Sequence, residues 1–248
     1  MGALKDKVAL VTGSSRGIGA AIAKLFSLEG AKVAVHGRDR AALTAVRVEI
    51  EGAGGKAMDV TADVTKFADL EAMRCDIERE LGGIDILVNN AAHQATFKDI
   101  GDISDKEWEL TFKVNIHAMF YLTKAAVPHM KSGSAIVNTA SVNSDMPNPI
   151  LLAYATTKGA IQNFTGGLAQ MLAPKGIRVN AVAPGPIWTP LIPSTMPEEA
   201  VANFGKQVPM KRAGQPAELA TAYVMLADPL SSYTSGTTVA VTGGKPFI

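Results

Sequence analysis

The amino-acid sequence predicts an α/β domain in which helices flank both faces of a seven-stranded parallel sheet. Short runs rich in β-branched residues alternate with longer segments of helical periodicity along the 248 residues. The runs are nearly continuous in apolar residues, as strands covered on both faces must be. Their alternation with helices predicts βαβ units with right-handed crossovers. The expected strands span residues 7–12, 32–36, 56–60, 84–89, 134–140, 177–182 and 237–241.

The helical segments between these strands carry signals of their own. In the third segment, apolar residues at spacings of three and four mark one buried face: Leu70, Met73, Ile77 and Leu81. Cys75 lies about 140° around the helix from this face, so we expect it to face solvent. Ser104 and Glu107 have the spacing of a capping box, which predicts the start of a long helix running toward Lys131.

Composition excludes several classes of protein. With 47% apolar and 19% charged residues the chain can build a core, which excludes intrinsic disorder. The 24 Lys and Arg against 23 Asp and Glu leave a net charge of +1, which argues against an electrostatic nucleic-acid binder. A single cysteine excludes an internal disulfide, and the four histidines show no metal-ligand spacing, so we expect no metal. No secretory signal and no membrane-length apolar run is evident, so we expect a cytoplasmic protein without a membrane partner.

We expect a single domain, residues 1–248, because no linker, repeat or low-complexity stretch interrupts the alternation. One region differs in composition. Seven of the thirteen prolines fall within residues 184–216, around a short helical pattern at residues 197–206. An insertion of this length is unusual in a compact domain and is typical of a lid or binding loop. We therefore predict that residues 184–216 form a lid over a substrate site.

A glycine-rich segment joins the first expected strand to the helix that follows it. Glycines there allow a tight turn, close approach of the backbone to an anion, and close packing of helix on strand. The start of the helix then presents free N–H groups and a partial positive charge to a pyrophosphate. We predict a dinucleotide-binding site that includes Gly13, Ser15, Arg16, Gly17, Ile18 and Gly19.

The second expected strand ends without an acidic residue, which bears on the choice of dinucleotide. A carboxylate at this place binds the ribose hydroxyls of NAD and repels a 2′-phosphate, whereas an arginine does the opposite. Arg38 follows this strand, and Arg16 lies in the first turn of the first helix, where the helix dipole disfavours a cation that has no anionic partner. Asp39 comes one residue later, and we expect it to cap the next helix. The pattern favours NADP(H) over NAD(H).

Residues 146–174 contain one charged residue, Lys158. A helix over residues 151–172 with so little polarity must be covered on nearly all sides. Its small residues, Ala155, Gly159, Gly166 and Gly167, allow the helix of another subunit to approach closely. Tyr154 lies one turn before Lys158 on the same face, and a nearby ammonium group favours the phenolate. We therefore predict that Lys158 lowers the pKa of Tyr154 and makes it a general acid/base.

With these segments in view, the chain resembles the short-chain dehydrogenase/reductase family almost from end to end. The resemblance rests on residues that occur in the family's order and approximate spacing: the glycine segment 12–19, Asp63-Val64, Asn89-Asn90-Ala91, Asn115, Ser141, Tyr154-x-x-x-Lys158 and Pro184-Gly185. It implies a doubly wound Rossmann fold of the short form, and an oxidoreductase that interconverts a carbonyl and an alcohol by hydride transfer.

The resemblance also implies roles for individual residues. Tyr154 would exchange a proton with the substrate oxygen, Ser141 would hydrogen-bond that oxygen, and Lys158 would hold the nicotinamide ribose. Asn115 would support the proton relay. The remaining cofactor contacts would come from Asp63, Val64, Asn89, Ala91, Pro184, Gly185, Ile187 and Thr189, although a role for Asn89 in bracing the sheet stays open.

Departures from the family pattern, at Ala92 and at Thr242-Gly243-Gly244, bear on the substrate rather than on the reaction. The substrate residues we predict are His93, Gln94, Met146, Leu151, Trp188 and Leu191. With Ile192 and Met196 they indicate a largely apolar pocket suited to neutral aldehydes or ketones. Two alternatives remain: a 3-oxoacyl-[acyl-carrier-protein] reductase, and a non-catalytic NADP(H)-binding sensor or scaffold. The resemblance further implies a homo-oligomer, a tetramer.

Overall fold

The computed structural model describes residues 2–247 and contains one seven-stranded sheet, parallel throughout, in the order β3-β2-β1-β4-β5-β6-β7. This is the doubly wound sheet that the sequence predicts, and all seven expected strands are present. The strands are β1 (Val8–Val11), β2 (Lys32–Gly37), β3 (Lys56–Thr61), β4 (Ile86–Asn89), β5 (Ala135–Thr139), β6 (Arg178–Pro184) and β7 (Thr238–Val241).

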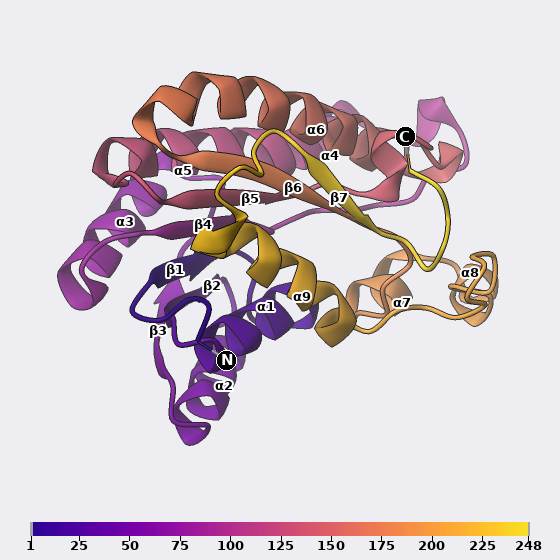
Figure 1. Ribbon diagram of the computed structural model, residues 1–248. Helices are drawn as coiled ribbons and strands as arrows, with labels where there is room; N and C mark the ends of the chain where they lie inside the picture. Colours follow the sequence, from indigo (N-terminus) through magenta and orange to yellow (C-terminus); the bar gives the residue numbers. More distant parts are fainter. Residues whose placement is uncertain (1, 248) are drawn as a thin grey trace.

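Helices cover the sheet in two layers (Figure 1). One layer contains α1 (Gly17–Leu28), α2 (Arg40–Gly52) and α9 (Pro216–Ala227). The other contains α3 (Phe67–Leu81), α4 (Asp105–Phe112), α5 (Ala118–Ala126) and α6 (Leu152–Leu172). None of the helices within residues 2–247 combines the length and apolar character needed to cross a membrane.

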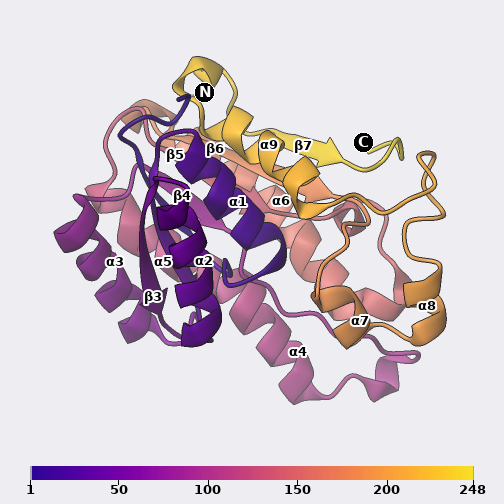
Figure 2. The same cartoon turned by 90° about the horizontal axis from the view of Figure 1, so that it is seen from below.

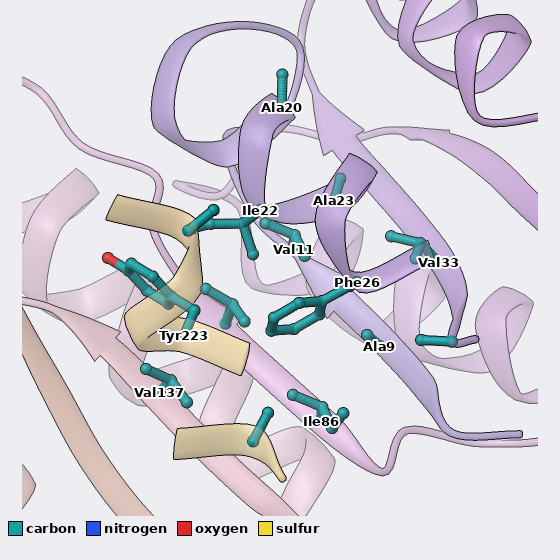
Figure 3. Packing of buried hydrophobic residues seen from close by; sticks show 14 of the residues in the cluster. Ala9, Val11, Ala20, Ile22, Ala23, Phe26, Val33, Ile86, Val137 and Tyr223 are labelled. Carbon is teal, nitrogen blue, oxygen red and sulfur yellow. The ribbon is translucent and has the colours of Figure 1, made fainter. Parts of the chain in front are cut away.

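Two large apolar clusters join these layers to the sheet. On one face, Phe26 of α1 and Tyr223 of α9 are fully buried against Val11 and Val137 of the central strands (Figure 3). On the other face, the predicted stripe of α3 packs in a second cluster, and Leu70 and Ile77 are fully buried. Burial on both faces explains why the strands carry almost continuous apolar runs.

Two local predictions are confirmed, and a third is displaced by one residue. Cys75 is exposed. Asp39 caps α2, because its carboxylate accepts a hydrogen bond of 3.1 Å from the Ala42 N–H group. Arg16 occupies the N-cap position of α1, one residue before the first helical turn in which the sequence places it.

The predicted long helix after Ser104 is interrupted. Ser104 caps α4, but α4 ends at Phe112, a π-helical segment (Lys113–His117) follows, and α5 ends at Ala126 before a 3₁₀ turn (Val127–His129). The sequence prediction misses the π-helical segment because its residues keep the ordinary apolar spacing of an α-helix. Such bulges in helices frequently mark functional sites, and Asn115 lies in this one.

Parallel strands bring their carboxyl ends to one edge of the sheet, where α/β proteins bind their ligands. Beyond this edge lie the short helices α7 (Leu191–Thr195) and α8 (Glu198–Ala202), as both views show (Figures 1 and 2). They belong to the proline-rich region, which begins where β6 ends at Pro184. Within this region Ile187 and Gly214 pair as an isolated parallel bridge.

Candidate active site

A cavity of about 1070 Å³ opens at the carboxyl edge of the sheet and gathers most of the predicted site residues. Those that line it are Gly13, Ser15, Arg16, Gly17, Ile18, Gly19, Arg38, Asp63, Val64, Ala91, His93, Gln94, Ser141, Met146, Leu151, Tyr154, Lys158, Pro184, Gly185, Ile187, Thr189 and Leu191. Three predicted residues, Asn89, Asn115 and Trp188, are not part of its lining.

The glycine segment is built for close approach of its neighbours. A side chain at Gly19 would overlap the carbonyl oxygen of Gly13. One at Gly13 would lie 2.9 Å from the Cα of Ala91, and Gly13 also has a positive φ of 65°. These glycines allow the turn to pack tightly, and the first residues of α1, Gly17, Ile18 and Gly19, line the cavity, where a pyrophosphate can meet the helix N-terminus.

The end of β2 carries the charges that the sequence analysis assigned to cofactor choice. Arg38 follows β2 directly and lines the cavity, and Asp39, one residue later, lines it as well while capping α2. Asp63 accepts hydrogen bonds from the N–H and hydroxyl of Thr65, at 2.9 and 2.8 Å. The Thr65 N–H bond lowers the pKa of Asp63, and the charge of Arg38 acts in the same direction. The glycine cradle and the cations Arg16 and Arg38 fit a phosphorylated dinucleotide.

Tyr154, Lys158 and Ser141 meet in the wall of the cavity. Tyr154 and Lys158 lie one turn apart on α6, and the Lys158 Nζ is 5.3 Å from the centre of the Tyr154 ring. The Lys158 ammonium is buried and donates a 2.6 Å hydrogen bond to the carbonyl oxygen of Thr139, at the end of β5. Ser141 follows the same strand, and its hydroxyl accepts from the Asn143 N–H at 3.1 Å.

The electrostatics of this pair differ from the prediction. Burial raises the pKa of Tyr154 to about 12, opposed by a hydrogen bond with Ser141. Burial also lowers the pKa of Lys158 to about 7. The direction is therefore opposite to the prediction that Lys158 lowers the pKa of Tyr154, because desolvation dominates in the protein alone and only the Ser141 hydrogen bond opposes it.

Asn115 is buried in the π-helical segment beneath the cavity. Its side chain accepts from the His93 N–H at 2.7 Å and donates to the His93 carbonyl oxygen at 3.0 Å. It also donates to the Thr157 hydroxyl at 3.0 Å. Asn115 thus connects the loop after β4 to α6, next to Lys158. The extra residue of the π-bulge gives Asn115 this position.

Two of the predicted residues have other contacts. Asn89 donates to Asn138 at 2.9 Å and to Thr123 at 3.2 Å, so its side chain joins β4, β5 and α5, which is the sheet-bracing alternative. Trp188 is 41% exposed and packs against Phe204, with ring centres 6.1 Å apart. Its neighbours Ile187 and Thr189 face the cavity, and the alternation of an extended segment turns Trp188 away.

The substrate end of the cavity is more polar than the sequence analysis expects. Apolar residues such as Met146 and Leu151 line it, together with Ile192 and Met196, as predicted. The imidazole and amide residues that share this lining are His93, Gln94, Asn143, Asn148, Asn203 and Gln207. The four amides that were not predicted, Asn143, Asn148, Asn203 and Gln207, come from the segment after β5 and from the proline-rich region 184–216.

Sequence analysis also missed residues that support the site. Asn90 donates to the carbonyl oxygens of Thr12 and Gly13, at 2.9 and 3.2 Å, and so ties the loop after β4 to the glycine segment. His36 bridges the Gly13 N–H (3.4 Å) and the Ala62 carbonyl oxygen (3.2 Å), and burial lowers the pKa of His36 to about 4. The motif Asn89-Asn90-Ala91 contained a signal for Asn90; the isolated His36 carried none. No group of three or more potential metal-ligating side chains occurs within residues 2–247.

Comparisons with known proteins agree with this geometry. The family described as Enoyl-(Acyl carrier protein) reductase matches residues 13–245. The chain is 46% identical to glucose and ribitol dehydrogenase of Daucus carota, over 97% of this chain and 85% of that protein. It is 45% identical to the chloroplastic NADPH-dependent aldehyde reductase 1 of Arabidopsis thaliana, over 97% of this chain and 86% of that protein.

A solved structure shows the same fold. A short-chain dehydrogenase from Burkholderia cenocepacia J2315 in complex with NADP superimposes with a TM-score of 0.91 at 32% identity, over 97% of this chain and 98% of that chain. Fold, site and relatives define an oxidoreductase of the alcohol/carbonyl type. The chain belongs to the short-chain dehydrogenase/reductase family.

Proposed function

We propose that this protein is an NADP(H)-dependent oxidoreductase that interconverts an aldehyde or ketone and the corresponding alcohol, with Tyr154 as general acid/base. The observation that carries the proposal is the meeting of Tyr154, Ser141 and Lys158 in the wall of one cavity that also contains the glycine cradle. When bound, the nicotinamide cofactor supplies the hydride, and the protein supplies position and the proton.

Each of the four predicted catalytic side chains has its own role in carbonyl reduction. Ser141 donates a hydrogen bond to the substrate carbonyl oxygen and orients it toward Tyr154. The Tyr154 hydroxyl gives its proton to that oxygen as negative charge develops there, which makes the alcohol. Lys158, adjacent to the phenol, favours the phenolate that remains. Asn115 holds the backbone at residue 93 and would support the return of a proton to Tyr154 from solvent.

The cofactor assignment is supported by charge. Arg38 and Arg16 line the cavity near Asp63, where the adenine end of the dinucleotide is expected. Asp39, the first carboxylate after β2, also lines the cavity, but it accepts from the Ala42 N–H group at the start of α2, and Arg38 comes before it in the chain. A relative named as NADPH-dependent and a neighbour bound to NADP agree with this choice.

The substrate class is supported by names and by the polar lining of the cavity. One relative is named as an aldehyde reductase, and another as a glucose and ribitol dehydrogenase. The amide groups of Asn143, Asn148 and Asn203 in the lining suit a substrate that carries hydroxyl groups. Aldehydes and small sugars are therefore the first compounds to screen, with oxoacyl thioesters in the same screen as the reductase alternative.

Replacing Tyr154 tests the proposal against a non-catalytic sensor. Tyr154→Phe removes one hydroxyl and leaves the ring, so we expect kcat for carbonyl reduction to fall by about 10²–10⁴-fold. NADPH affinity, measured by fluorescence titration, should change less than about twofold. Tyr233→Phe, at a fully exposed tyrosine, is the matched control. A wild-type protein that binds NADPH and reduces no carbonyl in the screen would support the sensor instead.

The assembly we propose is a homotetramer. Large apolar side chains stay exposed on neighbouring helices α4, α5 and α6, among them Trp108, Phe120, Tyr121 and Leu152. Gly166 and Gly167 of α6 have open space beside them, as close approach of another helix requires, whereas Ala155 is buried within its own chain and Gly159 packs near Ser144. Large exposed apolar patches on a single chain are typical of subunit interfaces.

A further inference from the structure

A histidine–glutamate pair borders the substrate end of the cavity. The His93 Nε2 lies 2.7 Å from the Glu107 Oε1, and both side chains are largely buried, with 31% and 21% exposed. The same carboxylate oxygen accepts from the Thr111 hydroxyl at 3.3 Å. Glu107 therefore turns toward His93 rather than back to the start of α4, where the capping-box pattern places it.

The backbone of His93 is held independently of its ring. Asn115 binds both the N–H and the carbonyl oxygen of residue 93, at 2.7 and 3.0 Å. The imidazole is thus fixed at two points, through the backbone by Asn115 and through Nε2 by Glu107. A ring held in this way is preorganised, so a ligand that binds it pays little conformational entropy.

The geometry leaves the other ring nitrogen available. His93 lines the cavity, whereas its partner Glu107 does not. Within residues 2–247, Nδ1 makes no hydrogen bond, in contrast to Nε2. When Nε2–H donates to Glu107, Nδ1 accepts a hydrogen bond in the neutral ring and donates one in the charged ring. A hydroxyl group is both donor and acceptor and can pair with either form.

We propose that His93, oriented by Glu107, is a hydroxyl-binding subsite that selects carbonyl substrates carrying an additional hydroxyl group near the reacting carbon. The inference rests on the proposed function, because Tyr154 and Ser141 define where the reacting oxygen lies. It adds a specificity-determining residue, His93, and a positioning residue, Glu107, that acts through it. A site built to bind a hydroxyl discriminates against the analogue that lacks it, since its buried polar group is then left unpaired.

The test compares two aldehydes with the same three-carbon chain, glyceraldehyde and propanal, with NADPH. We expect wild type to favour glyceraldehyde in kcat/KM. His93→Leu should lower the ratio of kcat/KM for glyceraldehyde to that for propanal by about tenfold, mainly through KM for glyceraldehyde. The substitution keeps both Asn115 bonds, because they go to the backbone of residue 93.

Glu107→Gln tests the role of the carboxylate, and His129→Leu is the control variant. The amide keeps the size of Glu107 but removes its charge, so the ratio should fall in the same direction, by less than in His93→Leu. His129→Leu removes the histidine of a comparable pair, 3.7 Å from Glu78 and far more exposed, and should leave the ratio unchanged. A ratio within twofold of wild type in both His93→Leu and Glu107→Gln, or an equal loss for both aldehydes, would overturn the subsite.

A binding measurement separates failure of the subsite from failure of the proposed function. The chain has four histidines, so the imidazole resonances of the NADP⁺-saturated protein can be assigned by NMR with the two histidine variants. Glycerol should shift the His93 resonance, and propan-1-ol at equal concentration should not. If glycerol shifts it while wild type reduces neither aldehyde, the subsite stands and the proposed function fails for this substrate class. If glycerol leaves it unmoved, the subsite is refuted even where both aldehydes are reduced.

Discussion

At the scale of single residues, Lys158 bears a large desolvation penalty. It is 2% exposed, and its pKa is lowered to about 7 from an ordinary value of 10.5. Between these two values the unfolded chain binds a proton that the folded protein does not, so the free energy of unfolding rises with pH across this window. The raised pKa of Tyr154 acts only above about pH 10, in the opposite direction.

Lys158→Met should remove this dependence. We expect the stability of wild type relative to Lys158→Met to rise by about 1 kcal/mol per pH unit between pH 7 and pH 9. Urea unfolding of the cofactor-free proteins at several pH values measures it. Lys124→Met, at an exposed lysine of α5, is the control and should track wild type. Parallel curves for wild type and Lys158→Met would show that Lys158 keeps its charge in the folded state.

Arg38 is the residue on which cofactor choice depends most directly. Arg38→Ala removes the cation that we assign to the 2′-phosphate, so the Kd for NADPH should rise about 10- to 100-fold while the Kd for NADH changes by less than about threefold. Arg40→Ala, two residues on in α2 and outside the cavity lining, is the matched control. Equal losses for the two cofactors would refute the assignment to NADP(H).

At the scale of elements, the proline-rich region 184–216 contacts the segment after β4 through Thr195, the last residue of α7. Its hydroxyl accepts from Gln94 Nε2 at 2.9 Å, and its carbonyl oxygen accepts from the Thr96 hydroxyl at 3.0 Å. These two bonds join α7 to the segment that also carries His93. Ile192 of α7 is buried as well, so packing and these bonds together set the local stability of the helix.

Thr195→Val should loosen α7 while nearly keeping the volume of the side chain at residue 195. It removes the hydroxyl bonds to Gln94 and to the Leu191 carbonyl oxygen and keeps the carbonyl bond to Thr96. We therefore expect faster amide hydrogen exchange in residues 191–204 and a KM for the carbonyl substrate raised several-fold. Ser194→Ala is the control, since the Ser194 hydroxyl bonds only to Leu191 within the same helix. Unchanged exchange in Thr195→Val would show that the hydroxyl bond to Gln94 does not hold α7 in place.

The elements also show where sequence reasoning succeeds and where it stops. The glycine segment and the Tyr154–Lys158 pair were predictable because their chemistry is local: one turn of helix, or one strand–helix junction. The pairing of Glu107 with His93 was not, because Glu107 has the same spacing to Ser104 whether it caps α4 or turns away. Nor could the sequence give the sign of the Tyr154 pKa shift, since desolvation depends on the residues that several distant elements pack around it.

At the scale of the whole molecule, the parallel sheet places the carboxyl end of every strand on one edge. The chain itself leaves the outer faces of α4, α5 and α6 uncovered. Aromatic side chains gather on α5 and at the adjoining start of α3: the Tyr121 ring centre lies 5.5 Å from that of Phe67 and 5.4 Å from that of Phe120. The exposed fractions of Phe67 and Phe120 are 52% and 45%. Burying such rings against a second subunit contributes about 25 cal/mol per Å² of apolar area.

Phe120→Glu tests whether this face holds subunits together. A carboxylate has to be desolvated in an apolar interface, so we expect the mass in solution, measured by light scattering after size exclusion, to drop from that of four chains to that of a smaller assembly. Val48→Glu places the same charge on an exposed apolar position of α2, on the opposite face of the sheet, and should keep the wild-type mass. A wild-type protein with the mass of one chain at micromolar concentration would contradict the tetramer. A Phe120→Glu protein that stays tetrameric would move the interface to another face.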